Sequence, residues 1–321
     1  MCCAVSAVLF THVAMRGLPV KTVAITGASG LVGSSLRHFL TTGGHKVISL
    51  VRESSEVREG CVFWDPSTGV IDEKGLKEVD AVVHLAGAPI AAGRWTEARK
   101  RSIKQSRIRG TDLIARTLAT MENGPRTLIS SSAVGFYGNR GSDILNETMP
   151  VGRGFLADVC EDWENATVPA ERAGIRVVKL RTGIVLSPQG GALGQMLLPF
   201  KMGAGGRLGS GKQYMSWIDL DDLIGMIYHA MYEDSLSGVV NATAPTPVPN
   251  AAFTSALGRV LGRPTVLPVP SIAVRAVFGE LGKEALLWGQ RAIPQKALSS
   301  GFKFFSEGVE DSLRFQLGRI D

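Results

Sequence analysis

The sequence predicts an α/β protein: a doubly wound parallel sheet of the Rossmann type with a small, mostly helical C-terminal lobe. Three observations support this prediction. Short apolar segments, typical of strands buried on both faces, alternate with amphipathic segments. Three glycines, at positions 27, 30 and 33, follow the first apolar segment. Glycine-rich and proline-rich stretches after residue 187 mark a change in composition.

The glycines lie on a strand-to-helix turn, because apolar residues recur at helical spacing after Gly33. Gly27 lets the chain turn sharply, Gly30 lets backbone approach a pyrophosphate, and Gly33 lets helix and strand pack closely. The helix N-terminus offers unpaired N–H groups to phosphates. The turn therefore predicts a dinucleotide site, and a tight turn without a ligand is the alternative.

The remaining elements follow in alternation. Further strands are expected at 46–51, 61–64, 80–84, 127–131 and 176–186, and helices at 95–118, 223–231, 250–262 and 271–290. Asp221 or Asp222 is expected to cap the helix at 223–231. We expect a flexible N-terminal extension over 1–20, a dinucleotide-binding domain over 21–245 and a substrate lobe over 246–321.

The second strand ends beside Arg52 and Glu53, which bear on the choice of cofactor. An arginine at the strand end suits a 2′-phosphate and favours NADP(H). A shift of one residue would give that position to Glu53, which suits the ribose 2′-hydroxyl of NAD. We expect NADP(H), with NAD as the alternative.

The composition is that of an ordinary globular chain, with 45% hydrophobic and 20% charged residues among 321. The four cysteines form no disulfide framework and no metal-ligand spacing, so we expect a cytoplasmic location and no metal. Residues 1–20 contain no acid, which leaves organelle targeting open. No segment is long enough to span a bilayer, so no membrane partner is expected.

Seven basic residues within 94–109 account for much of the net charge of +6. The simplest interpretation is a solvated helix face. A phosphate-bearing ligand or a nucleic acid would also explain them, but no aromatic platform accompanies the cluster. We therefore expect a small-molecule substrate and no nucleic acid. A homodimer is a further expectation.

Several motifs resemble those of the extended short-chain dehydrogenase/reductases. They are Thr-Gly-Ala-Ser-Gly-Leu-Val-Gly at 26–33, His-Leu-Ala-Gly at 84–87 and Ser-Ser-Ser-Ala-Val-Gly-Phe-Tyr-Gly at 130–138. Later segments at 94–95, 209–213, 217–222 and 289–295 resemble the "epimerase family" branch of atypical members, often labelled cell-division-inhibitor-like. The resemblance covers about residues 20–305.

The resemblance implies roles for individual residues. The pyrophosphate would be held by Gly27, Ser29, Gly30, Leu31, Val32 and Gly33. Arg52 would hold the 2′-phosphate, and Leu85, Ala86 and Gly87 would line the adenosine side. Arg107 would reach the cofactor, and Val185 would meet its nicotinamide end.

The catalytic residues of the wider superfamily are only partly matched. Active members pair a serine with a tyrosine acid/base and a lysine four residues later, one helical turn apart. Ser132 matches the serine, but the chain contains no Tyr-x-x-x-Lys, and Leu156 and Cys160 stand where that pair is expected. Tyr137 is the nearest replacement acid, although an aromatic residue there also suits the core. Cys160 suits inert packing better than a reactive thiol.

Two functions remain open. The first is an NADP(H)-dependent oxidoreductase or epimerase-like enzyme acting on a small substrate. The second is a catalytically inactive NADP(H)-binding sensor, because the Tyr/Lys pair is absent. His84 ends a buried strand and is expected to be a core histidine and not a base.

Overall fold

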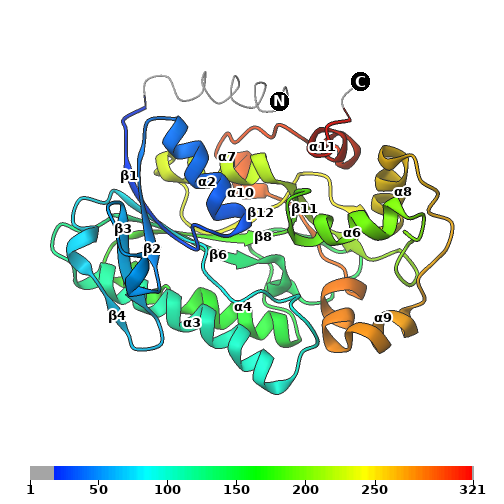
Figure 1. The fold of residues 1–321 in the computed structure, drawn as a ribbon, viewed down its shortest axis with the longest axis horizontal. Coiled ribbons are helices and arrows are strands. Elements are labelled where there is room, and N and C mark those ends of the chain that lie inside the picture. The colour runs from blue at the N-terminus through cyan, green and yellow to red at the C-terminus, as the bar shows by residue number, and fades with distance from the viewer. Residues whose placement is uncertain (1–17, 320–321) are drawn as a thin grey trace.

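The computed structural model describes residues 18–319, built around an eight-stranded sheet (Figure 1). The strand order is β12-β8-β6-β5-β1-β2-β3-β4, and all neighbouring strands run parallel except β3 and β4. The strands are β1 (Thr22–Thr26), β2 (Lys46–Val51), β3 (Cys61–Asp65), β4 (Val70–Ile71), β5 (Ala81–His84), β6 (Thr127–Ala133), β8 (Arg176–Thr182) and β12 (Gly238–Ala242). The predicted parallel sheet is confirmed. Of the predicted N-terminal extension, residues 1–17 lie outside the described residues.

Helices cover both faces of the sheet, as its buried strands require (Figure 1). The face formed by α2 (Leu31–Thr42) and α7 (Leu220–Tyr232) encloses one apolar core with side chains such as Ile25 and Ile129. The opposite face encloses a second core with Ala24 and Leu128. It is covered by α3 (Glu97–Thr120), α4 (Phe155–Asn165) and α5 (Val168–Arg172). Successive residues of β1 and β6 thus point into different cores, which fixes the register of the sheet.

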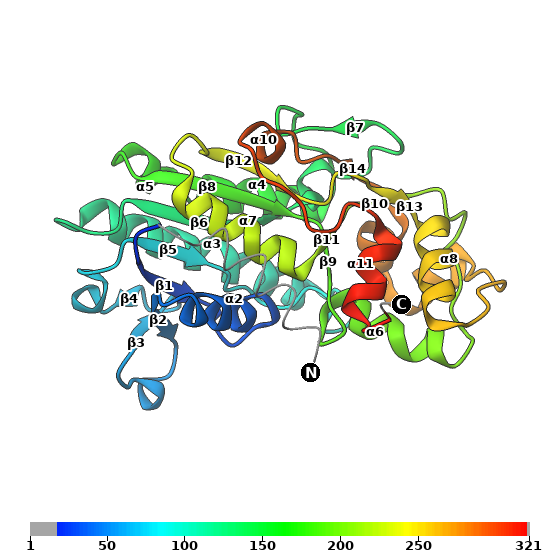
Figure 2. The same ribbon diagram turned by 90° about the horizontal axis from the view of Figure 1, so that it is seen from above.

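A lobe rich in helices adjoins the carboxyl ends of the strands (Figure 2). Its apolar core joins α6 (Gly191–Lys201), α8 (Asn250–Leu261) and α11 (Val309–Gln316) through Leu193, Phe253 and Leu313. It also contains α9 (Ser271–Phe278), while α10 (Gln295–Ser299) packs near β12. This core contains residues from before and after the predicted domain boundary at 245/246, since α6 precedes that boundary and α8 and α11 follow it. The boundary remains a prediction.

Two predicted segments are interrupted in the structure. The segment 176–186 divides at Gly183 into β8 and β9 (Ile184–Leu186), and β9 pairs with β11 (Trp217–Asp219) outside the main sheet. A Cβ at Gly183 would lie 2.4 Å from the Ser216 carbonyl oxygen, so the chains pass too closely for a larger residue. The predicted helix 271–290 ends at Phe278, because Gly279 adopts a φ of +60°. A short π-helical turn, η4 (Gly282–Leu287), follows.

Short 3-10 turns and short strands complete the fold. They are η1 (Ser54–Glu56), η2 (Glu73–Leu76), η3 (Val134–Tyr137), β7 (Ile144–Leu145), β10 (Tyr214–Met215), β13 (Val248–Pro249) and β14 (Arg291–Ala292). β14 pairs with β7, and β10 pairs with β13. The pairing of β14 with β7 connects the C-terminal part of the chain to the sheet domain, whereas β10 and β13 both belong to the lobe, whose core contains Met215 and contacts Val248.

Three aspartates at the start of α7 accept hydrogen bonds from residues near the C-terminal end of the chain. Asp219, and not Asp221 or Asp222 as predicted, caps the helix by accepting the Asp221 N–H at 2.9 Å. Its carboxylate also accepts hydrogen bonds from Ser312 (2.5 Å) and Gln316 (2.8 Å) of α11. Asp222 instead accepts the backbone N–H groups of Phe305 and Ser306. The buried aspartates therefore hold the final helix in place.

Burial raises the pKa of Asp219 from 3.8 to about 7, which predicts a pH-dependent stability. Because the folded protein retains this proton up to about pH 7, the contribution of Asp219 is greatest below pH 4 and is lost as the pH rises through 7. An Asp219→Asn variant cannot ionise. We expect its unfolding free energy to increase relative to wild type between pH 4 and 8, by at most about 4 kcal/mol at about 1.4 kcal/mol per pH unit.

Urea unfolding at several pH values measures this difference. Asp143→Asn, at an exposed turn, is the matched control and should give a much flatter profile. A constant difference between wild type and Asp219→Asn across this pH range would contradict the assignment.

Candidate functional site

The turn between β1 and α2 is shaped by glycines, as predicted. Gly27 has a φ of +68°, and a Cβ there would lie 3.1 Å from the Ala86 nitrogen. A Cβ at Gly33 would lie 2.2 Å from the Gly27 carbonyl oxygen, so the start of the helix rests directly on the turn. No side chain caps α2 at Gly30 and no acid lies in its first turn. The first N–H groups of α2 are therefore oriented to receive an anion.

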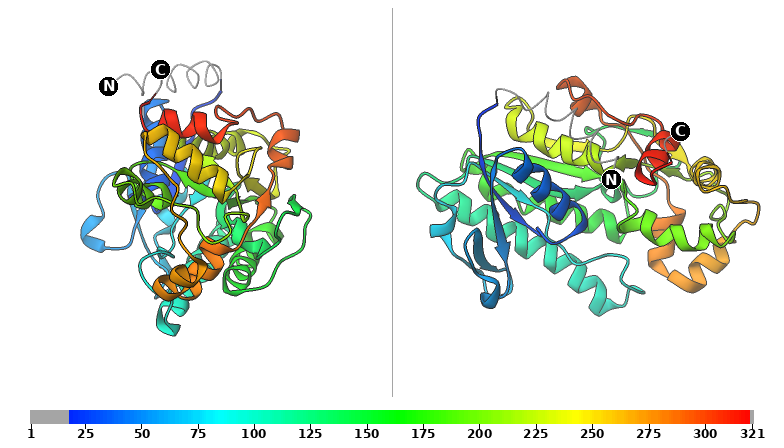
Figure 3. Two further views of the ribbon diagram at one scale, coloured as in Figure 1. Left: turned by 90° about the vertical axis from the view of Figure 1, so that its right-hand side faces the viewer. Right: turned by 45° about the horizontal axis from the view of Figure 1, so that its top comes forward.

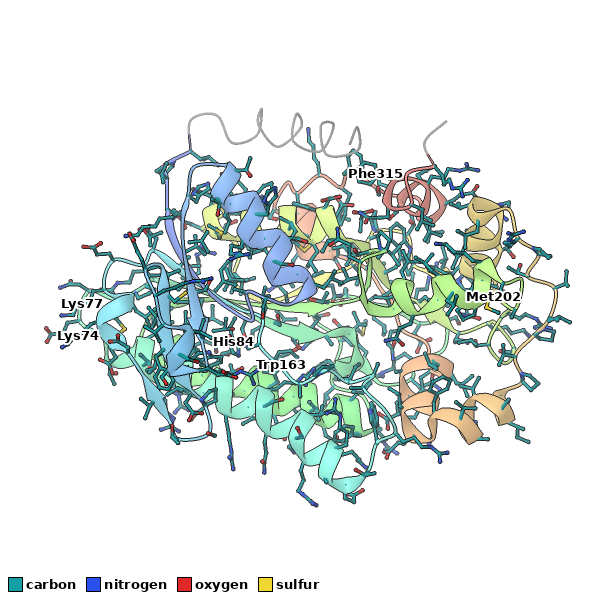
Figure 4. The ribbon with its side chains drawn as sticks, in the orientation of Figure 1. Lys74, Lys77, His84, Trp163, Met202 and Phe315 are labelled. Carbon is teal, nitrogen blue, oxygen red and sulfur yellow. The ribbon has the colours of Figure 1, made fainter. Side chains whose placement is uncertain are left out.

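A buried hydrogen-bond group ties the end of β1 to the end of β5. The Thr26 hydroxyl accepts the N–H groups of Leu85 (3.0 Å) and Ala86 (3.2 Å) and lies 2.8 Å from Nδ1 of His84. Since this hydroxyl already accepts two bonds, its own proton is directed to His84 Nδ1. Complete burial lowers the pKa of His84 to about 4, so the ring is neutral. His84, labelled in Figure 4, is a buried core histidine, as expected, and the Thr26 hydroxyl holds the segment that follows β5.

An open cleft of about 1480 Å³ lies at the carboxyl ends of β1, β2, β3 and β5. The strand order reverses between β1 and β5, and ligands of doubly wound sheets bind at such a point. Five arginines from four different segments line the cleft: Arg37, Arg52, Arg58, Arg101 and Arg109. None of the five pairs with a carboxylate among residues 18–319. Glu53, Glu56 and Asp65 also line the cleft, so its lining keeps a smaller excess of positive charge, which suits an anionic ligand.

The predicted cofactor residues fall into two groups. Gly27, Ser29, Gly30, Arg52, Leu85, Ala86 and Gly87 line the cleft. Leu31, Val32, Gly33 and Val185 lie beyond its lining, at the start of α2 and on β9. A Cβ at Gly191 would touch both Leu31 (3.5 Å) and the Val185 carbonyl oxygen (3.7 Å), so these two residues are near neighbours.

Arg107 supports the wall of the cleft from behind. Its guanidinium donates to the carbonyl oxygens of Ala88 (3.0 Å) and Ile103 (3.1 Å), and it lies 5.0 Å from the Trp163 ring. A Cβ at Gly87 would be 3.4 Å from the guanidinium carbon. In this arrangement Arg107 shapes the segment after β5, with its donors directed at the protein backbone.

Ser132 and Tyr137, the two catalytic candidates, belong to one buried polar network. Ser132 donates to Glu164 at 2.6 Å, and Glu164 forms a two-pronged ion pair with Arg181 at 2.8 Å for each contact. Arg181 also donates to the Tyr137 hydroxyl at 3.0 Å, which lies 2.8 Å from Oδ1 of Asn241. Tyr137 has no exposed surface, and burial raises its pKa. Both hydroxyls therefore donate their hydrogen bonds to buried side chains of the protein and are poorly placed to give a proton to a ligand.

Leu156 and Cys160 lie on the face of α4 next to the end of β6. A Cβ at Gly135 would be 3.2 Å from Cβ of Leu156 and 3.8 Å from the sulfur of Cys160. Burial raises the pKa of the Cys160 thiol to about 12, so it stays protonated. An apolar side chain and an unreactive thiol thus occupy the positions at which active members of the superfamily carry the catalytic tyrosine and lysine.

Sequence reasoning missed Arg37, Arg58, Arg101 and Arg109 as residues of the cleft. Arg101 and Arg109 belong to the basic cluster at 94–109, whose spacing along α3 was the available signal. Arg58 lies between β2 and β3 and gave no signal, since only the pairing of these strands makes it part of the cleft lining.

Neither a metal site nor a membrane-spanning helix is found within residues 18–319. No group of three or more His, Cys, Asp or Glu side chains is arranged to hold a metal ion in this part of the chain. Nor does any helix there have the length and apolar character needed to cross a membrane.

A Rossmann sheet with a glycine turn and an anion-binding cleft defines a dinucleotide-binding class of protein. Residues 23–242 match the NAD dependent epimerase/dehydratase family, and residues 269–315 match a domain of unknown function, DUF1731. The chain belongs to the NAD dependent epimerase/dehydratase family.

Three known proteins illustrate the similarity. "Epimerase family protein Mb2239" of Mycobacterium bovis is 47% identical over 92% of this chain and 98% of its own length. "Epimerase family protein SDR39U1 homolog, chloroplastic" of Arabidopsis thaliana is 41% identical over 91% of this chain and 86% of its own. A crystal structure of human epimerase family protein SDR39U1 with NADPH superposes with a TM-score of 0.85 at 31% identity, covering 93% of this chain and 100% of that one.

The environment of Cys160 predicts low reactivity. Because a buried thiol with a pKa of about 12 forms little thiolate, iodoacetamide at pH 8 should leave Cys160 unmodified in the folded protein. Half-buried Cys61 provides the internal comparison and should react faster. Peptide mapping by mass spectrometry measures both, and urea should make Cys160 reactive. Equal rates at the two sites in the folded protein would refute this description.

Proposed function

We propose that this chain binds NADP(H) in the cleft at the carboxyl ends of β1, β2, β3 and β5. The observation that carries the proposal is the set of five arginines without carboxylate partners among the described residues. NADP(H) brings a pyrophosphate and a 2′-phosphate, which match this excess of positive charge. The NADPH-bound structure of the human relative supports the same ligand.

The cofactor residues are assigned from the turn and the strand ends. Gly27, Ser29, Gly30 and the first turn of α2, with Leu31, Val32 and Gly33, receive the pyrophosphate. Arg52 follows directly after β2 and receives the 2′-phosphate. Leu85, Ala86 and Gly87 contact the adenosine side, and Val185 meets the nicotinamide end. Arg107 keeps the wall in place.

Glu53 also lines the cleft and is the residue that an NAD-preferring site would use. Arg52 and the other arginines give the cleft lining an excess of positive charge, so a negatively charged 2′-phosphate gains more there than a neutral hydroxyl. This charge balance favours NADP(H) over NAD.

Bound NADP(H) supplies hydride chemistry, and an oxidoreductase or epimerase-like activity on a small substrate is the first function we assign. The substrate would lie between the sheet edge and the C-terminal lobe. A cytoplasmic location and a homodimer remain predictions. The name of the Arabidopsis relative includes "chloroplastic", which describes that protein and bears on the alternative of organelle targeting.

A catalytically inactive sensor is the second candidate, and the surroundings of α4 favour it. Leu156 cannot transfer a proton, Cys160 holds its proton, and Ser132 and Tyr137 point into the buried network. An enzyme at this site therefore needs a proton from the substrate or from water. Turnover assays with a panel of carbonyl compounds and nucleotide sugars separate the two candidates. Net oxidation of NADPH supports an oxidoreductase, and conversion of a nucleotide sugar to its epimer without net oxidation supports an epimerase-like enzyme. Tight cofactor binding with neither change supports the sensor.

The 2′-phosphate assignment predicts a selective loss in Arg52→Ala. Removing one charge-assisted contact should weaken NADPH binding by about tenfold or more while leaving NADH affinity nearly unchanged. Fluorescence titration with each cofactor measures this selectivity. Arg116→Ala, at a surface ion pair on α3 outside the cleft, is the matched control and should change neither affinity. Equal losses for NADPH and NADH in Arg52→Ala would count against the assignment.

A further inference from the structure

A group of exposed apolar side chains lies on the C-terminal lobe, and none of them lines the cofactor cleft. Leu198, Met202, Val266, Leu267 and Ile272, the lobe patch, are between 67% and 82% exposed. Figure 3, left, faces this end of the molecule, and Figure 4 labels Met202 in the same lobe. Exposed apolar side chains that cluster at one place mark an interaction site more often than chance surface residues do.

The residues of the lobe patch are neighbours in the fold. Leu198 and Met202 stand one turn apart on α6 and its C-terminal cap. The loop after α6 runs beside the loop before α9: the Val269 N–H donates to the Arg207 carbonyl oxygen at 2.8 Å, and the Gly209 N–H donates to that of Val269 at 2.8 Å. Gly206 lies directly against Leu267 in the same pairing. The two loops thus bring Met202, Leu267 and Ile272 to one surface.

Cations surround the lobe patch. Lys201 precedes Met202, Arg263 begins the loop that carries Val266, and Arg275 stands one turn after Ile272 on α9. Arg207 lies on the paired loop, where its guanidinium donates to the Ser210 carbonyl oxygen. These four side chains are exposed, and none pairs with a carboxylate among residues 18–319.

Acidic residues are missing from the segments that build this surface. Residues 172–218 and 235–279 contain no aspartate and no glutamate. The next acid along the chain, Glu280, is paired with Lys100 at 3.0 Å. Within these two segments, protruding apolar side chains are therefore accompanied by basic residues and by no acidic ones.

We propose that the lobe patch docks the protein on the surface of an anionic lipid bilayer. Protruding apolar side chains enter the interfacial region of the bilayer, and the surrounding cations meet the headgroups. A second copy of this chain is disfavoured as the partner. In a symmetric contact the basic residues Lys201, Arg263 and Arg275 of one copy would face those of the other and repel them. The sequence-based expectation of no membrane partner concerned spanning segments, and a peripheral contact needs none.

The experiment is co-sedimentation of the full-length protein with large unilamellar vesicles. We expect binding to vesicles of phosphatidylcholine with 30% phosphatidylglycerol, little binding to pure phosphatidylcholine, and weakening in high salt. Leu267→Ser/Ile272→Ser and Lys201→Glu/Arg263→Glu should each lower the partition coefficient by about tenfold or more. Every variant keeps residues 1–17, so any contribution of that segment is common to all.

Matched controls come from other parts of the surface. Lys74→Glu/Lys77→Glu makes the same charge change at the opposite end of the molecule (Figure 4), and Leu298→Ser removes an exposed leucine from α10. Both should bind vesicles like wild type. Unchanged NADPH affinity and melting temperature in the patch variants show that they fold, and keep this test separate from that of the proposed cofactor.

Three outcomes would overturn the proposal. The first is absence of binding to anionic vesicles. The second is an equal loss in Lys74→Glu/Lys77→Glu, which would indicate attraction by net charge alone. The third is a concentration-dependent dimer in light scattering that Leu267→Ser/Ile272→Ser dissociates, which would make a second copy the occupant.

Discussion

The buried ion pair between Glu164 and Arg181 is the constraint on which the centre of this structure depends. It joins α4 to β8, and through Ser132 and Tyr137 it reaches β6, the turn after it and β12. Two charges can be buried together only when their remaining hydrogen-bonding groups are satisfied, and these neighbours satisfy them. Removing one partner would leave a buried charge, at a cost of about 3–5 kcal/mol. The network thereby fixes the position of α4 against β6 and β8.

This constraint explains why the site has a cofactor cleft without an evident proton donor. The hydroxyls of Ser132 and Tyr137, which sequence reasoning proposed for catalysis, serve the ion pair. On α4, Leu156 and Cys160 close the space beside β6 with apolar packing. The cleft itself is formed by other elements: the glycine turn, the segment after β5, and the arginines of α2, of α3 and of the segment after β2. Binding and proton transfer are therefore separable here, which is why an enzyme and a sensor both suit the fold.

The sequence predicted the sheet well, because its signals are local. The bounds of β2 agree with the predicted 46–51, and the close approach at Gly33 follows from the spacing of three glycines. Residues that act through long-range contacts could not be predicted in the same way. Arg58 joins the cleft only because β2 and β3 pair, and the direction of Tyr137 depends on Arg181 and Asn241. The break after Phe278 depends on Gly279, whose positive φ the apolar periodicity does not reveal.

The central claim is that the arginines of the cleft select NADP(H). Isothermal titration calorimetry of the wild-type protein with NADP+ and NAD+, at low and high salt, tests it most directly. We predict that NADP+ binds more tightly and loses more affinity in high salt, since its 2′-phosphate adds a charge-dependent contact. Equal affinities with equal salt dependence would contradict the account, because the arginines would then make no contact that distinguishes the two cofactors.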